Sequence, residues 1–211
     1  MPVHPPVTPP VNLAVIYYSS TGTIDTMARR AAATGEKAGA EVRLRQVQEI
    51  APDSAIDSVD EWREHVEATS SEPTATPDDI VWADAVLLGS PTRFGNVASQ
   101  LKHFLDSLGP QWSEGKLADK VYAGFTSSQT DHGGQESTLL ALYNTLHHFG
   151  GIIVAPGYTD PLKFADGNPY GVGHVTGPDN ADPVGEAEEE ALDHMVERVL
   201  EVARKLTTTT N

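Results

Sequence analysis

Apolar runs of strand length recur along the chain, separated by segments whose apolar residues repeat with a helical period. The first, third and fifth runs are almost continuously apolar, which is typical of strands buried on both faces of a parallel sheet. The predicted strands are Leu13–Tyr17, Val42–Val47, Ala85–Gly89, Val121–Phe125 and Ile152–Ala155.

Helical patterns fill the intervals between these strands. An alanine-rich segment from Ile24 to about Ala38 follows the first strand, and three later segments carry apolar stripes with the i, i+3, i+4, i+7 spacing. The stripes are Leu101–Leu108, Leu139–Leu146 and Leu192–Leu206, the last of which we expect in the core or at an oligomer interface. Alternating strands and helices predict a doubly wound α/β fold with right-handed crossovers.

Two segments exceed what a five-stranded unit of this kind requires. Residues 49–79 are rich in acidic side chains, and we expect an exposed excursion with a short helix around Glu61–Ala68. The acidic run within residues 49–72 is expected to be a solvated face. Residues 157–185 are rich in Gly, Pro, Asp and Asn and predict a long loop, of the kind that is usually functional or interfacial. Within it, Gly171–Gly177 lacks the glycine spacing of a dinucleotide-binding turn and is expected to be ordinary loop. The expected organisation is a proline-rich arm (1–11), one domain (12–207) and a tail (208–211).

Composition narrows the classes of function. The 211 residues include 14 Lys and Arg against 30 Asp and Glu, and a formal net charge of -16 repels nucleic acid phosphates. The absence of cysteine excludes disulfides, thiolate catalysis and cysteine-bound metals. The N-terminus does not resemble a signal peptide, and no segment approaches the ~20 apolar residues that span a membrane. We therefore expect a soluble, cytoplasmic protein without nucleic acid or membrane partners.

The junction between the first strand and the first helix is dense in hydroxyl groups. Ser19, Ser20, Thr21, Gly22 and Thr23 follow one another directly. The N–H groups of a helix N-terminus bind anions, and hydroxyls add neutral donors, although helix capping alone accounts for one or two such residues. The junction contains no lysine, so it is not a Walker A loop, and the G-x-G-x-x-G fingerprint is absent as well. What remains fits a terminal phosphate held without a metal, such as that of flavin mononucleotide (FMN).

Two further strand ends lead into polar, glycine-containing loops. Gly89–Asn96 offers close backbone approach, donors and an aromatic wall to a flat ligand; alternatively, Arg93 is solvated and Phe94 is in the core. Phe125–Ser137 is a similar loop before the next helix. If the fourth strand neighbours the third, these loops meet at the carboxyl edge of the sheet, where ligands of open α/β sheets bind.

The loop sequences YYSSTGTIDTMAR, GSPTRFGNVASQLKHFLD and FTSSQTDHGGQE resemble the cofactor loops of the WrbA family of flavodoxin-like NAD(P)H:quinone oxidoreductases. The resemblance covers roughly residues 12–206. It implies a flavodoxin-like sheet in the order 2-1-3-4-5, non-covalently bound FMN, NAD(P)H as electron donor, and a homotetramer, a dimer of dimers, with sites near subunit interfaces.

The same resemblance implies the site residues. Those expected to bind FMN are Ser19, Ser20, Thr21, Gly22, Thr23 and Ile24 at the phosphate, Pro91, Thr92, Arg93 and Phe94 at the ring, Ser127, Ser128, Gln129, Thr130, Asp131 and Gly133 at the ribityl chain and pyrimidine, and His148. Trp112 would lie over the flavin face, where nicotinamide and quinone stack; a core or subunit contact is its alternative. Many family members have a tyrosine at the position of Thr21, which contacts the nicotinamide cofactor.

The implied function is two-electron quinone reduction by ping-pong hydride transfer through the flavin. No catalytic protein side chain is required, and Arg93 and His148 have assisting roles, in charge stabilisation and proton delivery. We expect no metal, because the adjacent His147 and His148 of a helix point about 100° apart. The alternatives are a flavodoxin-type one-electron carrier and a protein-binding regulatory flavoprotein. The excursion at residues 49–79 and the PTRFGN loop distinguish the chain from a minimal carrier.

Overall fold

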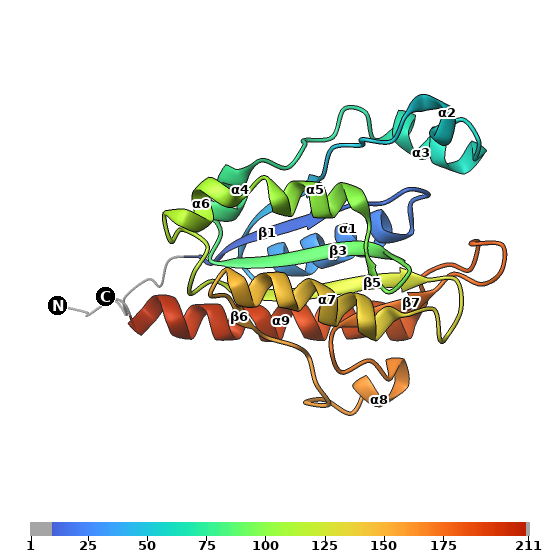
Figure 1. Ribbon diagram of the computed structural model, residues 1–211. Helices are drawn as coiled ribbons and strands as arrows, with labels where there is room; N and C mark the ends of the chain where they lie inside the picture. The colour runs from blue at the N-terminus through green and yellow to red at the C-terminus, as the bar shows by residue number, and fades with distance from the viewer. Residues whose placement is uncertain (1–9, 210–211) are drawn as a thin grey trace.

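A central sheet with helices on both faces forms the body of the protein (Figure 1). The computed structural model describes residues 10–209, so nearly all of the arm expected at residues 1–11 lies outside it. Five parallel strands lie in the order β2-β1-β3-β5-β6, which is the expected flavodoxin-like order. Their bounds are β1 Asn12–Tyr17, β2 Glu41–Gln46, β3 Ala85–Arg93, β5 Val121–Ser128 and β6 Ile152–Ile153.

The helices divide between the two faces of this sheet. Helices α1 (Thr23–Lys37) and α9 (Glu186–Thr209) cover one face, and α4 (Pro77–Trp82), α5 (Ser99–Asp106) and α7 (Gln135–His148) cover the other. Side chains alternate along a strand, so the central strands β1, β3 and β5 contribute to one apolar cluster on each face of the sheet.

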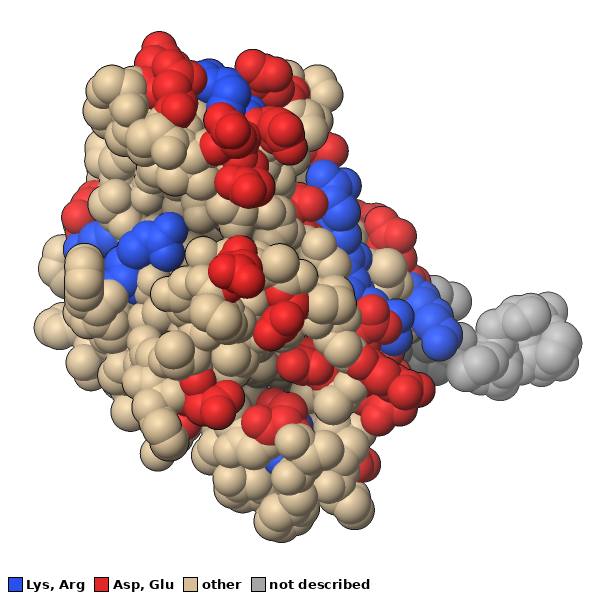
Figure 2. Space-filling model, turned by 90° about the vertical axis from the view of Figure 1, so that its right-hand side faces the viewer, with Lys and Arg blue, Asp and Glu red and all other residues tan. Residues whose placement is uncertain are grey.

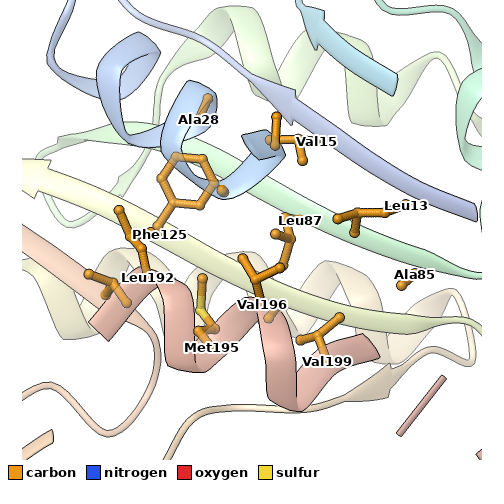
Figure 3. Packing of buried hydrophobic residues seen from close by; sticks show 14 of the residues in the cluster. Leu13, Val15, Ala28, Ala85, Leu87, Phe125, Leu192, Met195, Val196 and Val199 are labelled. Carbon is orange, nitrogen blue, oxygen red and sulfur yellow. The ribbon is translucent and has the colours of Figure 1, made fainter. Parts of the chain in front are cut away.

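The apolar stripe of the last helix lies in the core on the α1 side. Figure 3 shows Met195, Val196 and Val199 of α9 pointing toward Leu87 and neighbouring strand residues. All of these side chains are fully buried. Of the two expectations for this stripe, core and oligomer interface, the structure favours the core.

The prediction of an unstructured loop over residues 157–185 is wrong in part. A strand β7 (Val172–Val175) pairs in parallel with β5 beyond the end of β6, so Gly171–Gly177 is not ordinary loop. The fifth position of the sheet is thus shared by two short strands, with α8 (Lys163–Asp166) between them. A four-residue strand flanked by glycine has little local signal, because its conformation depends on pairing with β5.

The acidic excursion contains two helices, α2 (Asp53–Ile56) and α3 (Asp60–Ala68). The sequence predicted α3 but not α2. In Figure 1 both helices stand away from the sheet, above the ends of its strands. Most acidic side chains here are exposed, but Glu49 and Asp79 are not simply solvated. Asp79 is 4% exposed and caps α4. The solvated face was expected over residues 49–72, and within that run the expectation fails at Glu49, which accepts hydrogen bonds from Trp62 and Gln100.

The ends of the described chain add two observations. Helix α9 continues to Thr209, into the segment expected as a tail. Among residues 10–209, no helix is both long and apolar enough to cross a membrane.

Candidate functional site

A cavity of about 510 Å³ lies at the carboxyl edge of the sheet, where the three polar loops meet. The structure brings together most of the residues that the sequence singled out. The cavity is lined by Ser19, Ser20, Thr21, Thr23, Ile24, Pro91, Thr92, Arg93, Ser127, Ser128, Gln129, Thr130, Gly133, Thr176 and Asn180. Figure 2 faces this edge, over which Asp and Glu side chains are widely spread.

The first loop presents an open helix N-terminus to this cavity. Gly22 is the N-cap of α1, with φ 101°, and no side chain caps the helix. A positive φ is easily adopted only by glycine, which explains the residue at this position. Among the described residues, the hydroxyls of Thr21 and Thr23 have no hydrogen-bond partner, whereas Ser19 Oγ accepts from the N–H of Gly22 at 3.0 Å. Side-chain capping therefore does not account for this cluster of hydroxyls.

The acidic residue in the first turn of α1 is held away from the cavity. Asp25 accepts hydrogen bonds from the hydroxyl of Tyr17 and from Arg29, whose second partner is Glu72. Since Asp25 does not line the cavity and is ion-paired, it adds little repulsion to an anion bound at the helix N-terminus.

The second loop is a short hairpin between β3 and β4 (Asn96–Val97). Arg93 donates to the carbonyl of Thr92 at 2.9 Å and to Ser20 Oγ at 3.3 Å, which joins the second loop to the first. Phe94 at the turn has φ 54° and is fully exposed, so the alternative that placed it in the core is wrong.

The third loop is bound to the segment that follows β7. Thr176 N–H donates to the carbonyl of Ser128 at 2.9 Å, and Gln129 Nε2 donates to the carbonyl of Pro178 at 2.5 Å. Because β7 pairs with β5, Thr176 and Asn180 reach the cavity wall. Sequence analysis missed both residues, and the unusual length of the loop was the only signal.

The excursion also approaches the first loop. A Cβ placed on Gly22 would lie 3.7 Å from Nδ1 of His65 in α3. Burial lowers the pKa of His65, partly offset by the nearby Asp25. A lowered pKa favours the neutral form of the His65 imidazole, so this side chain adds no permanent positive charge beside the first loop.

Five predicted residues do not line the cavity. Gly22 is the N-cap of α1, Phe94 is fully exposed and Asp131 lines a different cavity. Trp112, in α6 (Gly109–Ser113), donates from Nε1 to the carbonyl of His148 at 2.7 Å. These two residues lie together at the opposite end of the sheet, where α6 and the end of α7 meet (Figure 1). Within a single chain, Trp112 and His148 therefore do not reach the hydroxyl-lined cavity.

In residues 10–209, no group of three or more His, Asp and Glu side chains is arranged to hold a metal ion.

The fold and the cavity together define a flavodoxin-like protein. The model of the NADPH-dependent FMN reductase family matches residues 11–160, and the chain belongs to this family. It is 48% identical over 201 residues to an NAD(P)H dehydrogenase (quinone) of Deinococcus radiodurans, covering 95% of this chain and 99% of that relative. A second protein of that name, from Rhizobium rhizogenes, is 39% identical over 199 residues, covering 91% and 96%.

Solved structures agree with this fold. A WrbA-like flavodoxin from Agrobacterium tumefaciens superposes with a TM-score of 0.63 at 24% identity, covering 92% of this chain and 98% of that one. A flavodoxin from the domain Archaea has a TM-score of 0.54 at 14% identity, covering 92% and 99%. Together with the family match, these relatives confirm the resemblance to the WrbA family that the three loops indicated.

Proposed function

We propose that this protein is an FMN-dependent NAD(P)H:quinone oxidoreductase that reduces quinones by two electrons in a ping-pong cycle. The observation that carries the proposal is a cavity in which an uncapped helix N-terminus and free hydroxyls face an arginine of the neighbouring loop. The names of the curated relatives support NAD(P)H as donor and a quinone as acceptor.

The donor set fits FMN. A phosphate dianion needs several hydrogen-bond donors, and the first loop provides hydroxyls and backbone N–H groups without a lysine. The third loop is narrow enough for close approach: a Cβ on Gly133 would stand 2.6 Å from Cβ of Ser128. Bound FMN supplies the redox chemistry, by which NAD(P)H, a proton and a quinone become NAD(P)⁺ and a hydroquinone.

The side chains of this protein bind and orient rather than react. Thr21 and Thr23 would hold the phosphate together with the first turn of α1, and Arg93 would stabilise negative charge near the ring. Gln129 and Thr130 cover the cofactor from the third loop, which the contact between Gln129 and Pro178 keeps in place. No protein nucleophile is needed, and the proton for the hydroquinone comes from solvent or from His148.

We further propose a homotetramer in which Trp112 and His148 serve the cavity of a neighbouring copy. Trp112 is 53% exposed and Phe94 is fully exposed, which is unusual for large aromatic side chains and supports an interface at both places. Analytical ultracentrifugation tests the assembly, and Trp112→Ala tests the part of the neighbouring copy. A protein that is monomeric, and whose turnover rate is unchanged by Trp112→Ala, would refute this part of the proposal.

The first experiment is titration of the cofactor-free protein with FMN and, as matched control, with riboflavin, which lacks the phosphate. We expect tight binding of FMN and weak binding of riboflavin, and Thr23→Val should weaken only the former. NAD(P)H should then bleach the flavin, and a benzoquinone should restore its colour.

Steady-state kinetics tests the mechanism. Parallel double-reciprocal lines for NAD(P)H and benzoquinone are expected, and intersecting lines would refute the ping-pong cycle. A flavoprotein that exchanges single electrons without NAD(P)H turnover would instead be a carrier. A protein that takes up no FMN would refute the proposed enzyme and favour the alternative of a protein-binding regulatory protein.

A further inference from the structure

A second cavity, of about 780 Å³, adjoins the hydroxyl-lined cavity, and Arg93 lines both. Its volume is in the range of small-molecule sites. Three segments form its wall: the residue after β1, the excursion with its helix α3, and the region from the end of β3 into α5. Its lining residues are Tyr18, Ile50, Ala51, Pro52, Trp62, Arg93, Asn96, Val97, Ser99, Gln100 and Lys102.

One carboxylate fixes the shape of this wall. Glu49 accepts hydrogen bonds from the hydroxyl of Tyr18 and from Nε1 of Trp62, each at 2.9 Å, and from Nε2 of Gln100 at 2.7 Å. It also accepts from the N–H of Ala51 at 2.9 Å. Burial acts to raise the pKa of Glu49, but these hydrogen bonds outweigh it and hold the pKa below the usual value. The charged form therefore persists and keeps the aromatic rings in place.

The cavity joins apolar walls to positive charge. Ile50 is 43% exposed although it is apolar, and it lies against the cavity with Trp62 and Val97. Lys102 also lines the cavity, is half exposed and, among residues 10–209, forms one ion pair, with Asp106 on the same helix. Among the described residues, Arg93 contacts neutral oxygens and no carboxylate. In a chain of net charge -16, such an arginine keeps its charge available for an anion.

We propose that this second cavity, which we call the tail cavity, binds the adenosine-phosphate half of NAD(P)H. The inference rests on the proposed function, since the nicotinamide half must reach a flavin in the first cavity. Adenine would lie against Trp62 and Ile50, because aromatic side chains stack on bases with little sequence preference. Lys102, which lines only this cavity, would face the phosphate on the adenosine side, and Arg93, which lines both cavities, would face the phosphate on the nicotinamide side. An uncharged quinone has no comparable need for two cations.

The decisive variants change the tail cavity without touching the flavin cavity. Lys102→Glu reverses a charge at its mouth, and Ile50→Glu adds a negative charge to its wall. Their matched controls are Lys116→Glu, a similarly exposed and ion-paired lysine, and Val59→Glu, an exposed apolar residue of the same excursion that does not line the cavity. All four positions are at the surface, so the fold should persist.

The measurement compares Michaelis constants for NADPH, for reduced nicotinamide mononucleotide (which lacks the adenosine half) and for benzoquinone. Each tail-cavity variant should raise the constant for NADPH by roughly fivefold to tenfold, since each places a negative carboxylate near the phosphates and the repulsion between partly exposed charges is modest. The constants for the mononucleotide and for benzoquinone should not change, and the control variants should match the wild type. An equal effect on the mononucleotide, or a selective effect on benzoquinone, would overturn the proposal.

Binding of ADP, followed by saturation-transfer NMR, separates this proposal from the proposed function. ADP should bind the wild type and both controls, and more weakly the two tail-cavity variants, whether or not the protein turns over quinones. A protein that turns over NADPH but binds ADP equally in all variants refutes the tail cavity alone. A protein that binds ADP as expected but takes up no FMN refutes the proposed function alone.

Discussion

The buried ion pair in α8 offers the sharpest quantitative test of how this fold is held together. The side chain of Lys163 is 0% exposed and that of Asp166 is 1% exposed. Lys163 Nζ donates to Asp166 Oδ2 and to the carbonyl of Gly171, the latter at 3.0 Å. Among the described residues, Asp166 Oδ1 has no partner. Burial lowers the pKa of Lys163 and raises the pKa of Asp166, because it disfavours both charges.

Removing one partner should cost far more than removing both. Lys163→Met leaves a buried carboxylate alone, and we expect a loss of about 3 to 5 kcal/mol in the free energy of unfolding. The double variant Lys163→Met/Asp166→Leu should lie within about 1 kcal/mol of the wild type, because apolar packing replaces a pair whose desolvation is costly. The unpartnered Oδ1 strengthens this expectation, since the native carboxylate is already incompletely satisfied.

Urea unfolding of the wild type, both single variants and the double variant measures the coupling as a double-mutant cycle. Lys116→Met, at an exposed ion pair, is the control and should leave the transition midpoint unchanged. Additive single effects, or a Lys163→Met variant as stable as the wild type, would refute the reasoning. Because α8 lies in the insertion that precedes β7, the single variants should also weaken FMN binding through Thr176.

Three further predictions concern packing, pH and the cofactor. Gly89→Ala would place a Cβ 2.3 Å from the ring of Phe125 and should destabilise the protein by about 1 to 3 kcal/mol in urea unfolding, whereas Gly109→Ala meets open space and should not. Burial acts to raise the pKa of Asp79, but hydrogen bonds from Thr76 and the guanidinium of Arg45 outweigh it and lower the pKa. The stabilisation by Asp79 is therefore complete above the usual carboxyl pKa and is lost as pH falls through the lowered value, so Asp79→Asn should cost more stability at pH 7 than at pH 3 in thermal unfolding. Thr176→Val removes a hydroxyl at the cavity and should raise the Kd for FMN by roughly fivefold, as one neutral hydrogen bond is worth ~1 kcal/mol; a Kd that matches the wild type would argue against its role.

The sequence by itself determined the elements with strong periodicity and the loops between them. Continuous apolar runs specify strands such as β1 and β3, since only burial on both faces tolerates them. Three hydroxyl-rich or glycine-rich loops after such strands were enough to locate a cavity, because parallel strands bring their carboxyl ends to one edge. Of the FMN-binding residues expected from the loops, most line one cavity, and their part in binding stays a prediction.

Only the tertiary structure decided where locally weak segments lie. Strand β7 exists because β5 offers unpaired backbone groups beyond the end of β6, and no local pattern of Val172–Val175 could reveal that. The same pairing brings Thr176 and Asn180 to the cavity, whereas Asp131 lines a different one. The tertiary structure also placed Trp112 and His148 at the end of the sheet opposite the cavity. Helix α7 begins beside the cavity and is 14 residues long, so its last residue, His148, lies at the other end, where Trp112 donates a hydrogen bond to it. Local periodicity determines what an element is, whereas long-range pairing and packing decide which elements meet.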